Sequence, residues 1–464
     1  MPSCAIVWFR RDLRLSDNPA LADALARAER VTPLFVEPDP AAPHGPGAAS
    51  LAWLERSLTA LDADLQARGS ALTRRRGPVP GALARAAAEC GASLVTCTRD
   101  WSPAGLAEER ATTAALGEVG IELHVVEAQL LSPPGSLATA SGSAYAVFTP
   151  FSRVWKAALR PMLPLPAPEH IPTAALSAGP PSSDTAGGYD VTFAWTPGEA
   201  GAQHLLGEFV RGGVASYDIE RDIPGVRGTS ELSPHLAWGE VSPRQIVASV
   251  LAAVDDETAW PYLRQLAWRE FGCHVLHAHP ETLDQPLRCE FAAFPWRDDP
   301  GGLAAWLEGR TGYPLVDAGM RQLAETGWMH NRVRLVAASF LTKHLLIPWQ
   351  TGETEFRNRL VDFDPAANAF NWQWVAGSGA DAAPYFRIFN PTLQGTRFDE
   401  DGTYIRRWVP ELSRLSPHSI HQPWLAPQSE LRAARVTLGV TYPRPIVDHR
   451  EARVRALAAL ASIK

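Results

Sequence analysis

The feature that most constrains this chain is a proline-rich stretch between residues 160 and 190. Proline lacks a backbone N–H and fixes φ, so it is excluded from helix interiors and from central strands. Prolines recur here too densely for either element, among Gly, Ser and Ala, at Pro161, Pro164, Pro166, Pro168, Pro172, Pro180 and Pro181. The stretch predicts an interdomain linker, which we place at residues 131–198. It divides a chain too long for one core into units at 1–130 and 199–464.

The first unit alternates short β-rich runs with helical ones. The β-rich runs fall at residues 5–9, 31–36, 93–97 and 123–126, and the alternation is typical of an α/β domain with a largely parallel sheet. A leucine stripe from Leu51 to Leu65 predicts a helix that Ser50 caps and Gly69 ends. The first strand runs into Arg10–Arg14 instead of a GxGxxG turn. We therefore expect a Rossmann-like fold without a nicotinamide dinucleotide site.

The second unit carries long helical patterns, and we expect it to be all-α. A composition of 46% hydrophobic and 20% charged residues is that of a globular protein with a buried core. No run of about 18 to 20 apolar residues is present and the first residues lack a signal-peptide pattern, so we expect a cytoplasmic protein without a membrane span. The five cysteines form no CxxC pair, and neither a disulfide framework nor a metal site is expected.

Charge and tryptophan content bear on function. The formal net charge of −7 does not indicate nucleic-acid binding, which usually shows as a basic domain, so any DNA contact must rest on a local patch. The chain has 16 tryptophans, and most lie beyond residue 190. They suit an aromatic lining or an electron-transfer route as well as an ordinary core.

A cluster of small polar residues, Gly228–Ser233, stands directly before a helix-like stretch at Pro234. Exposed N–H groups at a helix start, together with Ser and Thr hydroxyls, favour a phosphate. The same residue types also cap helices without any ligand. The motifs around the cluster favour the phosphate.

Those motifs follow one another in a fixed order. In the second unit they are Ser216–Asp222, Trp238–Arg244, Gln265–Phe271, Gly312–Arg321, Gly327–Arg332, Asp362–Asn368 and Asp381–Pro391, and the first unit has Trp8–Arg14 and Tyr145–Phe151. In this order the chain resembles the photolyase and cryptochrome flavoproteins, most closely the class I cyclobutane pyrimidine dimer photolyases. The resemblance implies an α/β antenna-type domain followed by a helical FAD-binding catalytic domain.

The resemblance also implies which residues hold the FAD. Its pyrophosphate would lie on the donors of the polar cluster, with Tyr217 at its edge, Arg334 as a charge partner for the nearby carboxylates, and Asn368 facing flavin N5. An amide near N5 tunes flavin electronics, and Asn at this position is typical of photolyases. The cofactor set is Tyr217, Thr229, Ser230, Glu231, Leu232, Ser233, Arg334, Asp362, Phe363, Asp364 and Asn368.

Three tryptophans match the electron-transfer chain of the family. Trp372 would lie next to the flavin, Trp349 in the middle and Trp296 at the surface. Their role would be photoreduction of oxidised flavin, a process separate from repair.

The resemblance further implies a lesion pocket and a DNA face. Repair requires the damaged dinucleotide to leave the duplex, and photolyases are among the enzymes known to flip their target. Trp268 and Trp374 would form apolar walls, and Asn331 would donate hydrogen bonds. The residues that match the DNA-binding set are Arg221, Gln265, Trp268, Asn331, Arg332, Trp374, Arg387 and Gln394.

One residue departs from the family pattern. Cyclobutane-dimer photolyases carry Glu where this chain has Gln265, one helical turn before Trp268. Glutamine can donate a hydrogen bond to the lesion but cannot transfer a proton, so we expect weaker but not absent repair. Photolyases of the (6-4) photoproduct also have Gln there, but they need two histidines where this chain has Asn331 and Leu335.

The sequence therefore predicts a deoxyribodipyrimidine photo-lyase that acts on ultraviolet-damaged DNA as a monomer. A blue-light receptor of the cryptochrome type with little or no repair is the alternative, favoured by Gln265. Repair of the (6-4) photoproduct is less favoured, and a generic α/β binding protein would leave the ordered motifs unexplained. The resemblance also implies an antenna chromophore, methenyltetrahydrofolate or 8-hydroxy-5-deazaflavin, and the residues near His44 and Glu109 do not decide between them.

Overall fold

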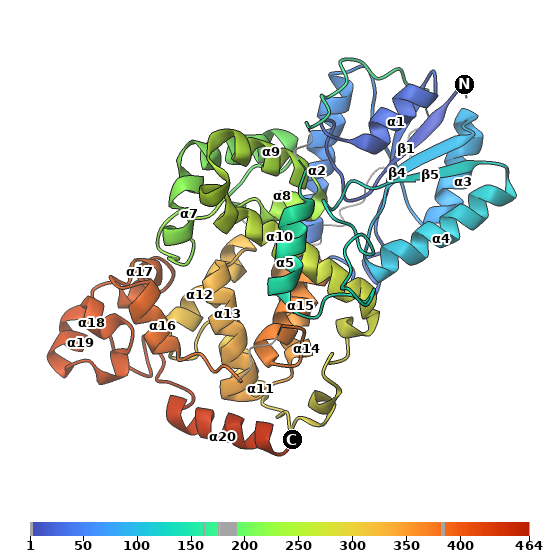
Figure 1. Cartoon of the computed structure of the whole chain (residues 1–464). Coiled ribbons are helices and arrows are strands. Elements are labelled where there is room, and N and C mark those ends of the chain that lie inside the picture. Colours follow the sequence, from blue (N-terminus) through green and yellow to red (C-terminus); the bar gives the residue numbers. More distant parts are fainter. Residues whose placement is uncertain (1–2, 161–162, 175, 177–192, 382–385, 464) are drawn as a thin grey trace.

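The computed structural model describes residues 3–160, 163–174, 176, 193–381 and 386–463. An α/β domain at the N-terminal end lies against a larger helical domain (Figure 1). The α/β domain consists of β1 (Ala5–Phe9), α1 (Pro19–Arg27), β2 (Val31–Val36), α2 (Ala48–Gln66), β3 (Thr73–Arg75), α3 (Val79–Cys90), β4 (Leu94–Thr98), α4 (Pro103–Glu118) and β5 (Glu122–Val126).

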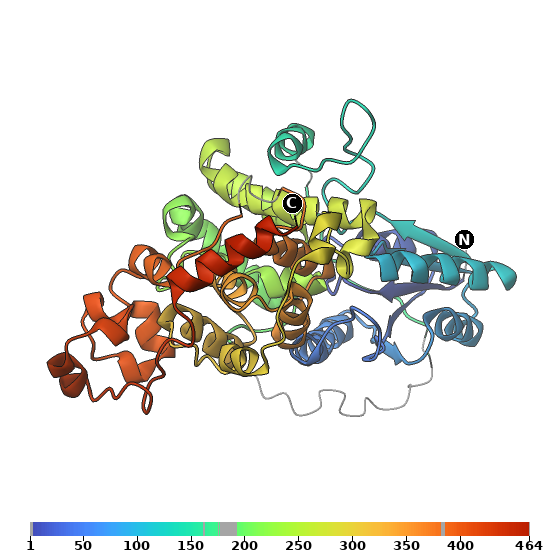
Figure 2. The ribbon, with the colours of Figure 1, turned by 90° about the horizontal axis from the view of Figure 1, so that it is seen from below.

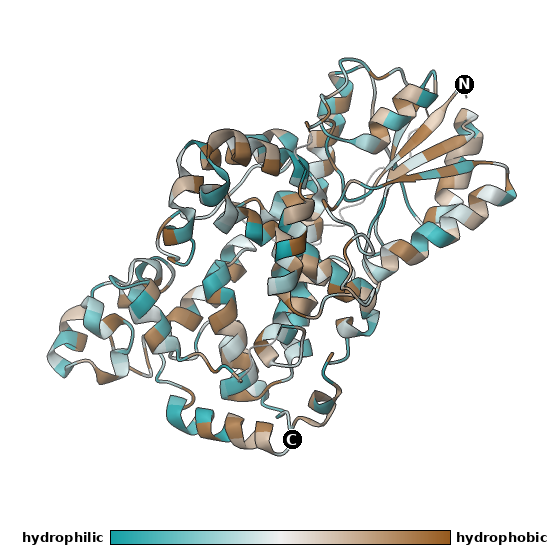
Figure 3. Cartoon of the chain, in the orientation of Figure 1, coloured by the Kyte–Doolittle hydropathy of each residue, from teal (hydrophilic) through white to brown (hydrophobic). Residues whose placement is uncertain are grey.

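Its sheet is parallel throughout, in the strand order β3-β2-β1-β4-β5. Successive residues of the central strand β1 point to opposite faces. Val7 packs in the core cluster that includes Trp53 of α2, and Ile6 packs in the cluster that includes Leu83 of α3. Helices thus cover both faces, so the strands are buried and hydrophobic, as their brown colour in Figure 3 shows.

The predicted α/β fold is confirmed, and four strands lie within one residue of their predicted ends. The sequence missed β3, a three-residue edge strand that contains two arginines. The expected Ser50 cap was wrong, because α2 begins at Ala48 and the Ser50 hydroxyl instead accepts a hydrogen bond from Trp238 Nε1 at 3.2 Å. The Ser50 hydroxyl therefore forms a hydrogen bond between the two domains.

The helical domain follows, and its predicted all-α class is confirmed. Among the described residues from 199 onward the extended structure is limited to one bridge between Leu438 and Tyr442. The elements are α6 (Glu199–Glu208), η1 (Phe209–Gly213), α7 (Val214–Glu220), α8 (Ser233–Trp238), α9 (Pro243–Ala253), α10 (Asp256–Ala278), η2 (Pro280–Leu283), η3 (Cys289–Ala293), α11 (Pro300–Leu307), α12 (Pro314–Thr326), α13 (Asn331–Ser339), η4 (Phe340–Leu345), α14 (Trp349–Arg359), α15 (Pro365–Ala376), α16 (Pro391–Phe398), α17 (Thr403–Trp408), η5 (Pro410–Leu412), α18 (Pro417–Ile420), η6 (Pro423–Leu425), α19 (Gln428–Ala434) and α20 (His449–Ala461).

Helix α15 lies at the centre of this domain, where it contacts α10, α13 and α14. Its ends are set by the sequence. Asp364 caps the N-terminus by accepting from Ala367 N–H, Pro365 occupies the first turn, and Gly377 ends the helix at φ +90°. Figure 2 shows α20 (red) across the lower side of the domain, where it packs on η4. This central helix carries the residues Asn368, Trp372 and Trp374.

The turn after β1 joins the domains. Leu13 N–H donates to the backbone oxygen of Trp238 at 3.1 Å, and Arg14 Nη1 donates to that of Gly239 at 2.9 Å. Gly239 has φ +69°, and a Cβ there would lie 2.0 Å from the backbone oxygen of Arg11, so only glycine fits. In a dinucleotide-binding fold the turn after the first strand holds a phosphate. In this chain the same turn forms hydrogen bonds to the helical domain instead.

The predicted linker range, 131–198, contains a further helix, α5 (Phe148–Ala158), which packs on α10. Part of this range therefore belongs to the folded core of the helical domain. Of the prolines that predicted the linker, Pro161, Pro180 and Pro181 lie outside the described residues. Across the described ranges of the chain, no helix has the length and apolar character needed to cross a bilayer.

Candidate functional site

A large cavity opens in the helical domain between α7, α8, α10, α13 and α15. It holds about 1800 Å³ of empty space including its open mouth. A smaller cavity of about 540 Å³ adjoins it and shares part of its lining. The predicted residues that line one or both are Tyr217, Arg221, Thr229, Ser230, Glu231, Leu232, Ser233, Gln265, Trp268, Asn331, Arg334, Asp362, Phe363, Asp364, Asn368, Trp372 and Trp374. The structure therefore brings most of the predicted cofactor and lesion residues together.

The polar loop offers unpaired donors to this cavity. Within the part of the chain that the structure describes, the backbone N–H groups of residues 229–231 donate to no other residue. Tyr262 OH donates to Ser230 Oγ at 3.0 Å and Trp328 Nε1 donates to Ser233 Oγ at 3.1 Å, which orients both hydroxyls. Free N–H groups beside oriented hydroxyls fit the pyrophosphate of a dinucleotide.

Two other members of the cofactor set contribute in different ways. Glu231 turns its carboxylate away toward Arg227 (2.8 Å) and Trp195 Nε1 (2.9 Å), so its backbone, at φ +54°, is what the cavity can use. Burial raises the pKa of Tyr217 to about 12, which keeps its hydroxyl protonated at neutral pH. Neither side chain brings a negative charge to the cavity.

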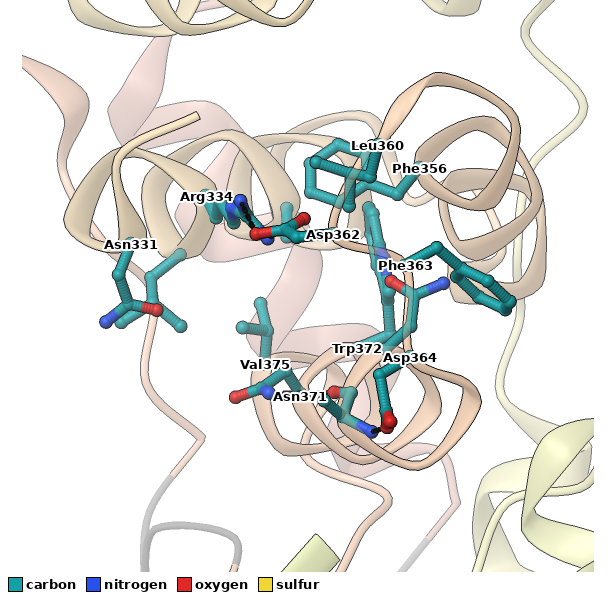
Figure 4. Close-up of a pocket in the computed structure, with 14 residues that line it drawn as sticks. Asn331, Arg334, Phe356, Leu360, Asp362, Phe363, Asp364, Asn371, Trp372 and Val375 are labelled. Atoms are coloured by element: carbon teal, nitrogen blue, oxygen red, sulfur yellow. Dashed lines mark hydrogen bonds and ion pairs between the residues drawn. The ribbon is translucent and has the colours of Figure 1, made fainter. Parts of the chain in front are cut away.

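Arg334 and Asp362 form a two-point ion pair in the wall that the two cavities share (Figure 4). Arg334 Nη2 donates to Asp362 Oδ2 at 2.7 Å and Nη1 donates to Oδ1 at 3.2 Å. Asp364 is paired more loosely, with Arg11 of the α/β domain at 3.6 Å. Both buried carboxylates thus have the charge partner that burial requires.

Asn368 is held by a residue that sequence reasoning missed. Its amide Nδ2 donates to Glu353 Oε1 at 2.9 Å and to the backbone oxygen of Glu353 at 3.2 Å. Both residues are buried, and burial raises the pKa of the Glu353 carboxyl above its ordinary value. Glu353 lies in a charged stretch of α14 that reads as a surface helix, so no sequence pattern pointed to it.

The three tryptophans of the predicted chain share one hydrophobic cluster. Trp372 and Trp349 are buried, whereas Trp296 is partly exposed. At Gly352 a Cβ would lie 2.1 Å from the Trp372 ring, so glycine allows α14 and α15 to approach. The ring nearest to Trp372 among the tryptophans with a measured contact is Trp306, at 6.3 Å between centroids. Trp306 was not predicted.

Three residues of the predicted lesion pocket line the large cavity. Gln265 is half-buried there, and its Nε2 donates to the backbone oxygen of Pro261 at 3.0 Å, one helical turn earlier. Trp268 stacks on Phe148 of α5 with 3.5 Å between ring centroids and 9° between planes. Trp374 of α15 also lines the cavity. Two indoles are therefore available as walls for a flat ligand.

The residues of the predicted DNA face lie in different surroundings. Arg221 lines the cavity, but the described linings do not include Arg332, Arg387 or Gln394. Arg332 pairs with Asp222 at 2.7 Å, and the same carboxylate lies 3.9 Å from Arg221 Nε. Of the motif that contains Arg387, residues 382–385 lie outside the described residues. One carboxylate thus offsets part of the positive charge expected at the cavity mouth.

A second large cavity, of about 2030 Å³ with its open mouth, lies between the two domains. The α/β domain contributes Arg10, His44 and Glu55 to its lining, and the helical domain contributes Trp238 and Phe363. Glu109 is not part of this described lining and instead pairs with Arg99 at 2.8 Å. Phe363 also lines the cavity of about 540 Å³ in the helical domain, so a single side chain borders both cavities.

The histidines near the end of α10 do not form a metal site in the described structure. His274 Nε2 lies 2.8 Å from the backbone oxygen of Ser132, and His277 packs edge-on against Trp101. Among the residues described, no three His, Cys, Asp or Glu side chains come together as metal ligands would.

A parallel α/β domain docked on a helical domain whose cavity offers free N–H donors and two indoles is a two-domain architecture suited to a dinucleotide cofactor. Residues 5–169 match the family model described as DNA photolyase, and residues 262–462 match the FAD binding domain of DNA photolyase. Deoxyribodipyrimidine photo-lyase of Agrobacterium fabrum (strain C58 / ATCC 33970) is 45% identical over 99% of this chain and 98% of its own. The chain belongs to the photolyase and cryptochrome family.

Solved structures similar to this chain also belong to the photolyase and cryptochrome family. A bacterial class III photolyase from Agrobacterium tumefaciens superposes with a TM-score of 0.94 at 43% identity, covering 100% of this chain and 98% of its own. A cryptochrome from Synechocystis sp. PCC6803 superposes with a TM-score of 0.90 at 32% identity, covering 99% of each chain. Both functional branches of the family therefore share this fold.

The first of these structures corrects one expectation, that the chain is closest to the class I photolyases. A class III enzyme is similar to it over its full length. The expectation rested on residues of the cofactor and lesion sites. A shared cofactor constrains such residues in related groups alike, so they identify the family and not its subdivision.

Proposed function

We propose that this protein uses light to repair ultraviolet-damaged DNA, with the cyclobutane pyrimidine dimer as its lesion. The observation that carries the proposal is the single cavity in which the free donors of residues 229–231 and the indoles of Trp268 and Trp374 meet. A reduced FAD bound there would supply, on absorbing blue light, the electron that opens the cyclobutane ring. The similarity to deoxyribodipyrimidine photo-lyases supports this assignment.

In this proposal the chain's own residues hold and shield the cofactor. The N–H groups of residues 229–231 and the Ser230 hydroxyl bind the pyrophosphate, and the paired Arg334 and Asp362 form a polar wall without net charge. Asn368, fixed by Glu353, presents an amide at the flavin N5 position. The tethered amide keeps one orientation, because both of its acceptors are buried with it.

The damaged dinucleotide would leave the duplex and enter the cavity between the indoles. Unstacking costs a few kilocalories per mole and is least at a damaged base. Stacking on an aromatic side chain returns roughly 1 to 3 kcal/mol per base. Arg221, Arg332 and Arg387 would hold the flanking phosphates, and Gln394 would lie on the same face. Gln265 would donate an amide hydrogen bond to a lesion carbonyl.

The cavity between the domains is where we propose the antenna chromophore. It is lined by the aromatic Trp238 and Phe363 and by charged side chains that include Arg10 and Glu55, a mixture that suits a conjugated ring with polar edges. Phe363 also lines the cavity of about 540 Å³ in the helical domain, so a chromophore bound between the domains would lie beside the proposed flavin site. The lining is compatible with a folate or a deazaflavin, and the absorption spectrum of protein purified from its source would distinguish them.

The test is irradiation of reduced protein with short duplexes that carry one defined lesion each. We expect blue light to restore the two pyrimidines of a cyclobutane dimer and to leave a (6-4) photoproduct unchanged. The same samples kept in the dark are the control. Absence of light-dependent dimer repair by flavin-loaded, reduced protein would refute the proposal.

A cryptochrome-type light receptor is the second candidate, favoured by Gln265 and by the similarity to the Synechocystis cryptochrome. It predicts flavin photoreduction without repair of either lesion. The experiment above separates the two functions, because only the repair enzyme restores pyrimidines.

A further inference from the structure

Glu270 is a buried carboxyl of α10 that neither the cofactor set nor the lesion set uses. Its side chain is 1% exposed, and no cation lies within ion-pair distance of it in the described structure. Two residues earlier on the same helix, Trp268 lines the cavity. A buried acid without a cationic partner is costly, so it calls for a reason.

The hydrogen-bond partners of Glu270 lie in the range 131–198, which was expected to be a linker. Glu270 Oε1 accepts from Leu131 N–H at 2.5 Å, and Oε2 accepts from Ser132 N–H at 3.0 Å and from Trp155 Nε1 at 2.6 Å. One helical turn later, His274 Nε2 lies 2.8 Å from the Ser132 oxygen. The carboxyl thus fastens both ends of the segment 131–155 to α10.

The fastened segment supports a lesion wall. Helix α5 of this segment begins with Phe148, which stacks on Trp268 at 3.5 Å and 9°. Phe148 is buried and is not part of the described cavity lining, whereas Trp268 is. Phe148 therefore backs the indole from the side away from the cavity, and its own position depends on how α5 is held.

We propose that Glu270 is a positioning residue for lesion binding: by fastening residues 131–155 to α10, it holds Phe148 behind Trp268 and sets the plane that the indole offers to a flipped base. The inference rests on the proposed function. Stacking needs a fixed ring plane, so a looser Phe148 weakens binding of the lesion more than it weakens the chemistry that follows.

The test compares Glu270→Gln with the wild type. The amide keeps the size of the side chain but replaces one acceptor oxygen by an N–H₂ group, which faces N–H donors. For a duplex with one cyclobutane thymine dimer we expect Kd to rise about five- to tenfold. The repair yield at saturating DNA should change less than twofold, and the flavin absorbance per protein should stay unchanged. Hydrogen exchange at Leu131 and Ser132 should speed up.

Two further variants keep the inference falsifiable if Glu270→Gln does not fold. Trp155→Phe removes one donor to the carboxyl, and Phe148→Leu removes the backing ring, so each should weaken lesion binding at least threefold. Glu257→Gln, on the exposed first turn of α10, is the matched control and should leave Kd unchanged.

The double variant with Glu270→Gln and Phe148→Leu gives the decisive comparison. Because both changes act through Trp268, it should bind the lesion no more weakly than the worse single variant. Additive losses, or a Glu270→Gln protein whose Kd lies within twofold of the wild type, would overturn the inference. Wild-type protein that neither binds nor repairs the dimer would instead refute the proposed function, and this inference with it.

Discussion

In the proposed lesion pocket, Gln265 is the residue whose substitution we expect to raise the repair yield. Its amide is half-buried in the cavity and uses one N–H on the backbone oxygen of Pro261. A carboxylic acid at this position would donate its proton to the lesion carbonyl as negative charge develops there, and charge-assisted hydrogen bonds are about twice as strong as neutral ones.

We therefore predict that Gln265→Glu raises the dimer-repair yield by about three- to tenfold, corresponding to roughly 1 kcal/mol of added stabilisation. The measurement is restored thymine per absorbed photon in reduced protein saturated with lesion DNA. Gln66→Glu on the exposed face of α2 makes the same substitution far from the site and should have no effect. An unchanged or lower yield for Gln265→Glu would show that the glutamine does not limit the yield of dimer repair.

Trp372 is the residue on which photoreduction should depend. It is buried in the cluster that also contains Trp349, and it lines the cavity of about 540 Å³ where we propose that part of the flavin binds. We predict that Trp372→Phe slows photoreduction of oxidised FAD at least tenfold, because phenylalanine is much harder to oxidise. Repair by previously reduced protein should persist. Bleaching of the visible absorption band of oxidised flavin under blue light measures the rate.

Trp306 supplies the matched comparison for that experiment. Its ring lies 6.3 Å from that of Trp372, yet it is not part of the predicted chain. Trp306→Phe should therefore retain photoreduction. A loss in Trp306→Phe with none in Trp372→Phe would redirect the electron route through Trp306.

At the scale of elements, the contact between α10 and the segment that contains α5 should respond to pH. Burial raises the pKa of Glu270 to about 7, against the lowering effect of its hydrogen bonds and of the neighbouring Arg269. Between about pH 4.3, the ordinary pKa of a glutamate, and about pH 7, the carboxyl of Glu270 is therefore protonated in the folded state and ionised in the unfolded state. Stability from this group is fully present at low pH and is lost as pH rises through about 7.

Comparison of the wild type with Glu270→Gln isolates this effect. We predict that the wild type loses stability relative to the variant as the pH rises from 5 to 8, by an amount on the order of 3 kcal/mol. Thermal unfolding of both proteins across this pH range measures the difference. If the stabilities of the two proteins change with pH in parallel, the raised pKa assigned to Glu270 is wrong.

The elements also show what a sequence can and cannot predict. The buried strands of the sheet were predictable, because their hydrophobic runs are short and are bounded by turns. Strand β3 was not, since its arginines are half-buried and bond to carboxylates of neighbouring elements. Helix α5 was hidden by the prolines that follow it, although its aromatic residues pack in the core.

The candidate site divides in the same way. Ordered motifs identified most of the residues that line the cavity, because contact with a cofactor restricts residue type over a long stretch. Glu353 was missed because it acts on another side chain and lies among charged neighbours that resemble a solvent-facing helix. Glu270 stands inside the motif Gln265–Phe271 and was missed because its partners lie in the range expected to be a linker. Such roles become visible only when distant segments are placed side by side.

For the whole molecule, the distance between the cavity that lies between the domains and the large cavity of the helical domain depends on how firmly the domains are docked. Glu240 lies at their interface and is fully buried. It accepts from Trp53 Nε1 of α2 at 3.2 Å and from Gly198 N–H at 2.8 Å, and it also bonds to Ser57 of α2 and to His235 of α8. One carboxylate thus joins the α/β domain to the helix that borders the flavin cavity.

Glu240→Gln would turn an N–H₂ group toward these donors and leave at least one of them unsatisfied. Breaking such a buried network costs about 3 kcal/mol, so we predict a fall in Tm of roughly 5 °C or more. Hydrogen exchange in α2 around Trp53 should accelerate while flavin content is retained, because the weakened hydrogen bonds lie between the domains. Glu118→Gln, which is exposed at the end of α4, should change neither quantity. If Glu240→Gln unfolds at the wild-type Tm with α2 equally protected, docking depends on the Arg14 contacts instead, and Glu240 is not the residue that fixes the spacing of the two cavities.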